Sequence, residues 1–170
     1  MSVHPKWSKA KKQLKSLMCD SLRLRVDFHV INYRKAHDQL GRVVITVDKE
    51  EKLSMCTITA EREEYKQEWD IRNETNQYDF DDVSNNRAIQ SQAHQQLKEE
   101  GIYAQYDFFP ALHEYVNSSI KESLQSPDIL INILCLLDRR MGKRTLRKMR
   151  DTILEEHPIV QYFYELRCEA

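Results

Sequence analysis

Residues 23–33 have the sequence RLRVDFHVINY, and their alternation decides the fold class. If this stretch is extended, one face carries Leu24, Val26, Phe28 and Val30, and the polar side chains lie on the other. A period of two residues is typical of a strand with one buried face. The segment therefore predicts an antiparallel sheet, the sheet class that commonly leaves one face in solvent.

Two more strands are expected soon after this one, over about residues 42–48 and 53–59, which are rich in residues that favour strands. Short connections favour an antiparallel meander of the three strands. Before the sheet, residues 7–18 carry apolar side chains at helical spacing and predict an amphipathic helix. From about residue 61 the period becomes helical.

Helix signals continue to the C-terminus, with breaks at Gly101, Gly142 and Pro158, and an acidic loop is expected over residues 73–84. The sequence predicts one α+β domain over residues 1–170: an N-terminal helix, a three-stranded meander and a bundle of about five helices. The sheet-containing part covers about residues 1–72 and the helical part about 85–170. The expected helices after the sheet cover residues 61–72, 85–100, 110–123, 126–140, 143–155 and 159–168.

Composition excludes several classes of protein. With 170 residues, 41% hydrophobic and 31% charged, the chain has the composition of a globular domain. The longest apolar run, residues 129–137, is too short to span a bilayer, and residues 1–15 lack the apolar region of a signal peptide. The four cysteines are far apart and include no C-x-x-C pair. We expect a cytoplasmic protein with reduced thiols and no membrane association.

Charge is balanced overall but segregated along the chain. The formal net charge is −1, which by itself predicts neither a nucleic acid nor a membrane as partner. Residues 6–15 hold five lysines and no acid, residues 61–82 hold nine acids and three bases, and residues 139–150 hold seven bases and no acid. Such segregation favours steered association with a complementary protein surface.

The first candidate site is the polar face of the predicted first strand, with the connection and turn beside it. Arginine, histidine and tyrosine recognise carboxylate or phosphate groups and can transfer protons. The alternative is a solvated sheet face held by cross-strand charge pairs. The candidate residues are Arg23, Arg25, Asp27, His29, Tyr33, Arg34, His37, Arg42 and Asp48.

The second candidate site is the basic segment at the helix break, with Arg139, Arg140, Lys143 and Arg144, and it continues through Arg147, Lys148 and Arg150. An anionic partner could bind there. Alternatively, these bases complement a helix dipole or pair with the chain's own acidic residues 61–82. A phosphate-loop motif is excluded because the required glycine position is Leu137. No histidine pair has metal-ligand spacing, so we expect no metal or cofactor.

Several short segments together resemble a family of small uncharacterised bacterial proteins over nearly the whole chain. The resemblance implies a bacterial cytoplasmic protein, and it carries over no catalytic residue. The segments that carry it are residues 7–9, 19–22, 25, 33–34, 37–38, 41–42 and 137–146.

Three functions remain open. The first is a non-enzymatic protein-interaction module, such as an immunity or antitoxin-like protein, because charge is segregated and convergent catalytic groups are lacking. The second is binding of nucleic acid or a phosphorylated small ligand through the clustered Arg and His residues. The third is an enzyme that uses His29 or His37 as acid and base. The sequence leaves the partner and the oligomeric state open.

Overall fold

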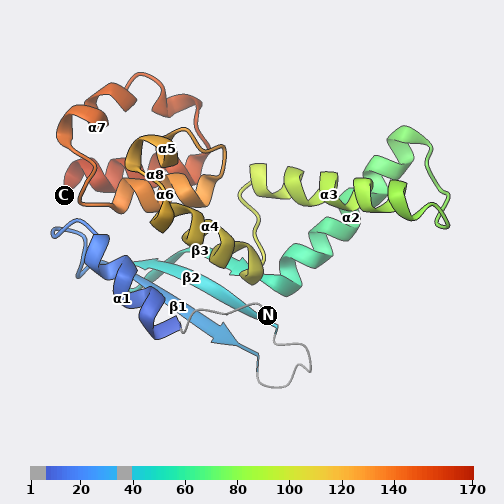
Figure 1. Cartoon of the computed structure of the whole chain (residues 1–170), viewed down its shortest axis with the longest axis horizontal. Coiled ribbons are helices and arrows are strands. Elements are labelled where there is room, and N and C mark those ends of the chain that lie inside the picture. The colour runs from blue at the N-terminus through green and yellow to red at the C-terminus, as the bar shows by residue number, and fades with distance from the viewer. Residues whose placement is uncertain (1–6, 34–39) are drawn as a thin grey trace.

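The computed structural model describes residues 7–33 and 40–170 of the chain. Figure 1 shows a helix, then a sheet, then a series of helices, which confirms the predicted α+β fold. The strands are β1 (Val26–Asn32), β2 (Gly41–Val47) and β3 (Glu50–Cys56). The helices are α1 (Trp7–Leu17), α2 (Thr57–Thr75), α3 (Val83–Glu99), α4 (Gln105–Asn117), α5 (Ile120–Leu124), α6 (Ile129–Leu137), α7 (Lys143–Met149) and α8 (Pro158–Glu169), with a 3₁₀ turn, η1 (Ile153–Glu155).

The sheet is the predicted meander, with strand order β1-β2-β3 and antiparallel neighbours. Its core face carries Val26, Phe28 and Ile45, which are fully buried. These side chains belong to one apolar cluster that also includes residues of α1, α4, α6 and α8. Every residue of α6 except Asn132 is buried, because other helices surround it. The apolar run in α6 therefore forms the centre of the helical half.

The first strand is shorter than the predicted 23–33. The ladder ends where Val26 pairs with Val47, because the next residues, Asp48 and Lys49, have positive φ and turn the chain into β3. Leu24, which we expected on the buried face, is 98% exposed in a turn before the strand. The prediction that residues 23–25 continue the strand is therefore wrong.

Other boundaries also differ from the predictions. The helix expected to begin at Pro110 begins at Gln105, and a break after Asn117 separates α5 from it. The carboxylate of Asp107 accepts the backbone N–H of Ala104 at 2.7 Å and stabilises this earlier start. Burial of Phe108 favours the same start, although Pro110 cannot donate a helical hydrogen bond. The third strand ends at Cys56 and α2 begins at once, so the predicted strand to residue 59 is too long.

Helices α2 and α3 form an antiparallel hairpin, the α2–α3 arm, that projects away from the sheet and the other helices (Figure 1). Ile71, Ile89 and Ala93 form a small buried cluster of their own between the two helices. Asn76, in the left-handed conformation, ends α2, and Asp82 caps α3 by accepting the N–H of Asn85 at 3.0 Å. The connection is therefore shorter than the predicted loop over residues 73–84.

One histidine joins the arm to α4. The two ring nitrogens of His94 on α3 lie 2.8 Å from a carboxylate oxygen of Glu64 on α2 and 2.8 Å from one of Asp107 on α4. Tyr106 stacks on the ring with a centroid separation of 5.9 Å. Burial lowers the pKa of His94, but the hydrogen bond to Glu64 and the charge of Asp107 outweigh burial and raise it. The charged imidazole therefore donates to both carboxylates.

This contact predicts a pH-dependent stability of the arm. Because the folded pKa of His94 lies above its unfolded value of about 6.5, its stabilising contribution is complete below that value. The contribution is lost as pH rises through the folded pKa. Hydrogen-exchange protection factors of α3 amides should fall over this range in the wild type and stay flat in His94→Gln. The control His113→Gln, at an exposed histidine, should keep the wild-type profile; a flat wild-type profile would contradict the expectation.

Candidate functional site

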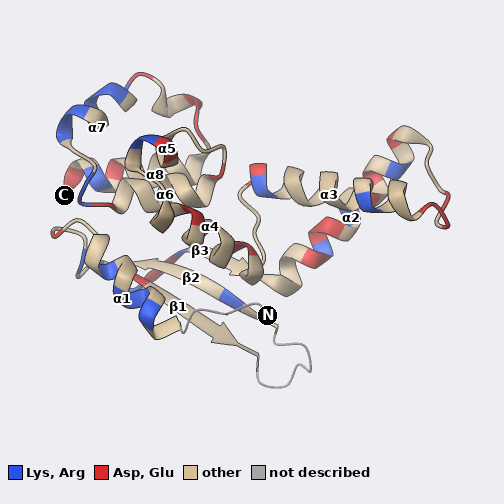
Figure 2. Cartoon of the chain, viewed as in Figure 1, with Lys and Arg blue, Asp and Glu red and all other residues tan. Residues whose placement is uncertain are grey.

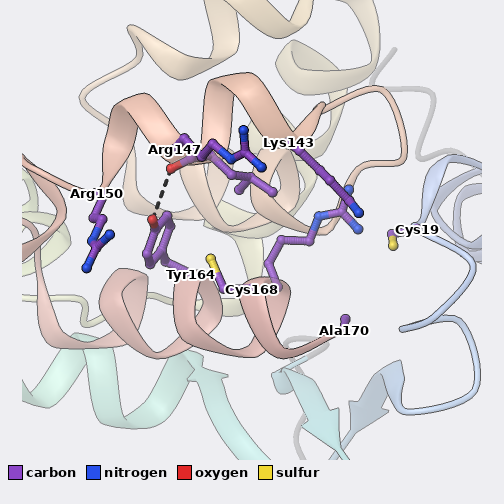
Figure 3. Close-up of a pocket in the computed structure, with 9 residues that line it drawn as sticks. Cys19, Lys143, Arg147, Arg150, Tyr164, Cys168 and Ala170 are labelled. Atoms are coloured by element: carbon purple, nitrogen blue, oxygen red, sulfur yellow. Dashed lines mark hydrogen bonds between the residues drawn. The ribbon is translucent and has the colours of Figure 1, made fainter.

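A pocket of about 710 Å³ lies between α7, α8 and the turn that follows α1 (Figure 3). The labelled side chains come from α7 on one side and from α8 on the other, with Cys19 at one end. Four of its lining side chains are cations. The lining residues are Cys19, Lys143, Leu146, Arg147, Arg150, Tyr164, Arg167, Cys168 and Ala170.

Helical spacing brings the α7 cations to one face. Lys143, Arg147 and Arg150 follow one another at four and three residues, so they lie on the same side of one helix and its end. Leu146 is buried beneath them, and its carbonyl accepts the hydroxyl of Tyr164 at 2.9 Å. This bond, drawn in Figure 3, holds α7 against α8 and keeps the cations over the pocket.

Arg167 supplies the fourth cation, from α8. A terminal nitrogen of its guanidinium donates to the carbonyl of Met141 at 2.9 Å and to that of Asp138 at 3.4 Å. Its Nε is buried and has no hydrogen-bond partner within the described residues. A buried guanidinium N–H without an acceptor is costly, so the hydrogen-bonding capacity of the Arg167 side chain is only partly used within the described residues.

The charge of the pocket is not neutralised by neighbouring acids. Within residues 7–33 and 40–170, no ion pair joins Lys143, Arg147, Arg150 or Arg167 to a carboxylate. Figure 2 shows blue segments along α7 and both blue and red segments along α8, on the opposite side of the molecule from the α2–α3 arm. The pocket is therefore an electropositive cavity.

Two thiols share this pocket. Burial raises the pKa of Cys19, but hydrogen bonds from Ser21 and the nearby Arg167 guanidinium outweigh it and lower the pKa. The Sγ of Cys19 lies 3.0 Å from the hydroxyl oxygen of Ser21. Burial and the hydrogen bond with Cys168 raise the pKa of Tyr164. Ser21 and, after it, Arg167 thus favour the negative form of one group in the pocket wall.

The turn between α6 and α7 is fixed by a fully buried carboxylate. Asp138 accepts two hydrogen bonds from the side chain of Arg140, at 2.7 and 3.1 Å, together with the hydroxyl of Tyr115. Burial alone would raise the pKa of Asp138, but these hydrogen bonds hold it below its usual value. Backbone hydrogen bonds of 2.8 Å join Cys19 to Leu137 and Arg139 to Leu17, on either side of the Met18–Asp138 bridge. This pairing places Cys19 beside α7 and α8.

The predicted basic segment contributes only in part. Its members Lys143, Arg147 and Arg150 line the pocket. Arg139, Arg140, Arg144 and Lys148 are not among the lining residues. Arg140 is paired with Asp138. The expectation that these bases pair with the acidic residues 61–82 is wrong for the described part of the chain, where no such ion pair occurs. These acids lie on the α2–α3 arm, on the opposite side of the molecule from α7, and are therefore too far away to pair with the basic segment.

Most of the described sheet-face candidates form ion pairs with neighbouring side chains. This agrees with the alternative interpretation, a solvated sheet face held by charge pairs. Arg23 pairs with Asp20 at 2.8 Å, and both lie in the turn before β1. Arg25 makes a two-pronged contact with Asp48, with distances of 3.0 and 2.8 Å. The expectation that the two arginines extend the strand's polar face is therefore wrong.

The remaining described members of that group contact neighbouring side chains. Lys11 and Lys15 of α1 reach Asp27 at 3.0 and 3.3 Å, and His29 lies 3.6 Å from the same carboxyl group. Arg42 pairs with Glu51 at 3.0 Å. The Tyr33 hydroxyl lies 3.3 Å from the Sγ of Cys56. Arg34 and His37 lie outside the described residues. The sheet face is thus a surface of charge pairs.

Sequence reasoning missed Arg167, Tyr164 and the thiols as pocket residues. No local pattern joins Cys19 to residues 164–168, because only the tertiary fold brings them together. The helical spacing of Lys143, Arg147 and Arg150 is a local signal that could have selected the correct half of the basic segment.

In the described ranges, no helix has the length and apolar character needed to cross a membrane.

A protein-family model matches residues 6–168 of the chain. Comparison with curated proteins and with solved structures gave no match. The matched segment includes α1, the sheet, the arm and nearly all of the pocket lining. The chain therefore belongs to the SF0329 protein family.

Proposed function

We propose that this protein binds a phosphorylated small molecule in the pocket between α7 and α8. The observation that carries the proposal is the convergence of Lys143, Arg147, Arg150 and Arg167 on one cavity, with no carboxylate paired to them in the described chain. Guanidinium groups match phosphate geometry and form the stronger, charge-assisted hydrogen bonds. Arg167 adds a cation from α8 to the cations that α7 and its end bring to the pocket.

The shape of the site supports a small ligand over a nucleic acid. Its volume of about 710 Å³ lies within the range typical of small-molecule pockets. Leu146 and Tyr164 add apolar surface to the lining, which suits a ligand with an organic body as well as a phosphate. A nucleic acid would need a basic surface that extends along the molecule, whereas the α2–α3 arm is rich in acids (Figure 2).

Isothermal titration calorimetry with inorganic pyrophosphate and with a nucleoside diphosphate tests the proposal. We expect Arg147→Gln/Arg150→Gln to weaken binding at least about tenfold, because two charge-assisted contacts are removed. The control Lys9→Gln/Lys12→Gln removes the same charge from exposed positions on α1 and should bind like the wild type. No heat of binding to the wild type, or equal weakening in both variants, would overturn the proposal.

We also propose that the protein works in a bacterial cytoplasm. The family resemblance noted above supports this setting, as do the free thiols of Cys19, Cys56, Cys135 and Cys168. The protein-interaction role expected from the charge pattern stays a prediction, and it does not require the pocket. The enzyme alternative finds less support, since His29 lies on the sheet face and none of the described histidines lines the pocket.

A further inference from the structure

The α2–α3 arm carries a row of aromatic side chains on its surface. Tyr65 and Trp69 are one helical turn apart on α2, and their ring centroids lie 6.3 Å from each other. The ring of Phe80, from the connection to α3, lies 6.1 Å from that of Trp69. The three side chains remain 62%, 37% and 59% exposed, in the order Tyr65, Trp69 and Phe80. Contiguous exposed apolar surface of this kind marks interaction sites more often than isolated exposed residues do.

The aromatic row is held in place, although it is exposed. The guanidinium of Arg72 lies over the ring of Phe80, 4.8 Å from its centroid, and Arg72 itself is buried. The buried cluster of Ile71, Ile89 and Ala93 keeps α2 and α3 together behind it. Aromatic side chains that are already ordered lose little conformational entropy when they bind, which makes them good anchors.

Acidic residues are frequent along the segments that carry this row. Glu61 lies four residues before Tyr65, and Glu68 lies three residues after it. This spacing puts both glutamates on the face of α2 that carries Tyr65 and Trp69. Burial, and then the neighbouring charge of Glu64, raise the pKa of Glu68. Within the described part of the chain, several arm carboxylates form no ion pair: Glu61, Glu68, Asp70, Glu74, Asp79, Asp81 and Asp82.

We propose that the α2–α3 arm is a docking surface for a basic amphipathic segment of a partner protein. The apolar side chains of that segment would pack on Tyr65, Trp69 and Phe80, and its lysines and arginines would pair with the surrounding carboxylates. This arrangement of apolar anchors within a charged rim is the usual anatomy of helix-recognition surfaces. The proposal is independent of the pocket, which lies on a different part of the molecule.

A second copy of this chain fits the arm less well than a foreign partner. The basic helix α7 would be its complementary surface, but the apolar side chains of α7, Leu146 and Met149, pack against the core of their own chain. The side chains of α7 itself that would then face the aromatic row are mainly charged. The row requires a partner that offers apolar and basic side chains together.

The two tryptophans provide a reporter and an internal control for the test. Trp69 lies in the aromatic row, whereas Trp7 packs on Phe108 and Phe109 beside α4. The indole N–H signals of the ¹⁵N-labelled full chain can be followed while a synthetic peptide is added. The peptide spans about four helical turns, with leucines along one face and lysines and arginines elsewhere. A control peptide carries glutamates in place of the basic residues.

We expect the basic peptide to shift the Trp69 signal and leave Trp7 unchanged, and the acidic peptide to shift neither. Glu68→Lys/Asp81→Lys and Phe80→Ala should each weaken binding at least about tenfold, through lost charge pairing and lost apolar contact. The control Glu155→Lys/Glu156→Lys, at exposed acids outside the arm, should bind like the wild type.

Three results would overturn the proposal. In the first, neither peptide shifts Trp69. In the second, the basic peptide shifts both indoles, or binds all variants equally. In the third, the Trp69 signal moves with protein concentration when no peptide is present, which would identify a second copy as the occupant of the arm.

Discussion

Replacing Asp138 with asparagine is expected to lower the free energy of unfolding by about 3 kcal/mol, the lower end of the range for breaking a buried ion pair. The carboxylate of Asp138 is fully buried, whereas part of the Arg140 side chain is exposed. Water can therefore solvate the Arg140 guanidinium after the substitution, which reduces the cost of losing the ion pair. Guanidinium denaturation followed by circular dichroism measures the change. The wild type should also lose stability as pH falls below about 3.9, because the folded pKa of Asp138 lies below its unfolded value.

The exposed Arg25–Asp48 pair supplies the matched control. Asp48→Asn removes one carboxylate oxygen in the same way, at a turn position with positive φ that asparagine tolerates. Its denaturation midpoint should stay at the wild-type value, since surface ion pairs contribute little. Equal effects of the two substitutions would show that burial of Asp138 does not control stability.

Replacing Phe108 with alanine is expected to cost about 4 kcal/mol, within the range for fully buried phenylalanines. Its ring lies 6.0 Å from that of Trp7 on α1 and 6.3 Å from that of Phe28 on β1, measured between centroids. The substitution would therefore leave a cavity at the junction of α1, the sheet and α4. Thermal and chemical denaturation both measure this loss.

Phe80→Ala removes the same side chain from the arm surface and is expected to cost well under about 1 kcal/mol. The pair of variants separates the role of Phe108 in the core from the role of Phe80 on the arm. If Phe108→Ala were no more destabilising than Phe80→Ala, α1, β1 and α4 would not share the packing described above.

The elements of this fold were predictable where local chemistry sets them. Alternation around Phe28 predicts the first strand, and Gly142 predicts the break before α7. The start of that strand was not predictable, because the alternation continues back to Arg23. What ends the ladder is the partner strand, which turns away at Asp48 and Lys49. A strand's length is thus decided by its neighbour as well as by its own sequence.

The candidate sites were also predictable only where local sequence determines them. The sequence indicates an anion site near Lys143 because bases cluster there. It carries no signal for Cys19 or Arg167, which reach the pocket only through the pairing of the chain after α1 with the turn after α6. The spacing of Tyr65 and Trp69 places them on one helical face, but only the hairpin of α2 and α3 shows that this face points outward.

The short backbone bridge between Met18 and Asp138 has a consequence for how the chain reaches its native state. Most of the sequence lies between these two residues, so the contact closes a very long loop. During synthesis on a ribosome, residues 17–25 emerge long before their partners around residue 138. Until the last third of the chain has been synthesised, the apolar side chains of α1 and the sheet that pack on the later helices remain exposed to solvent. A slow final step in refolding and a dependence on chaperones are the expected outcome.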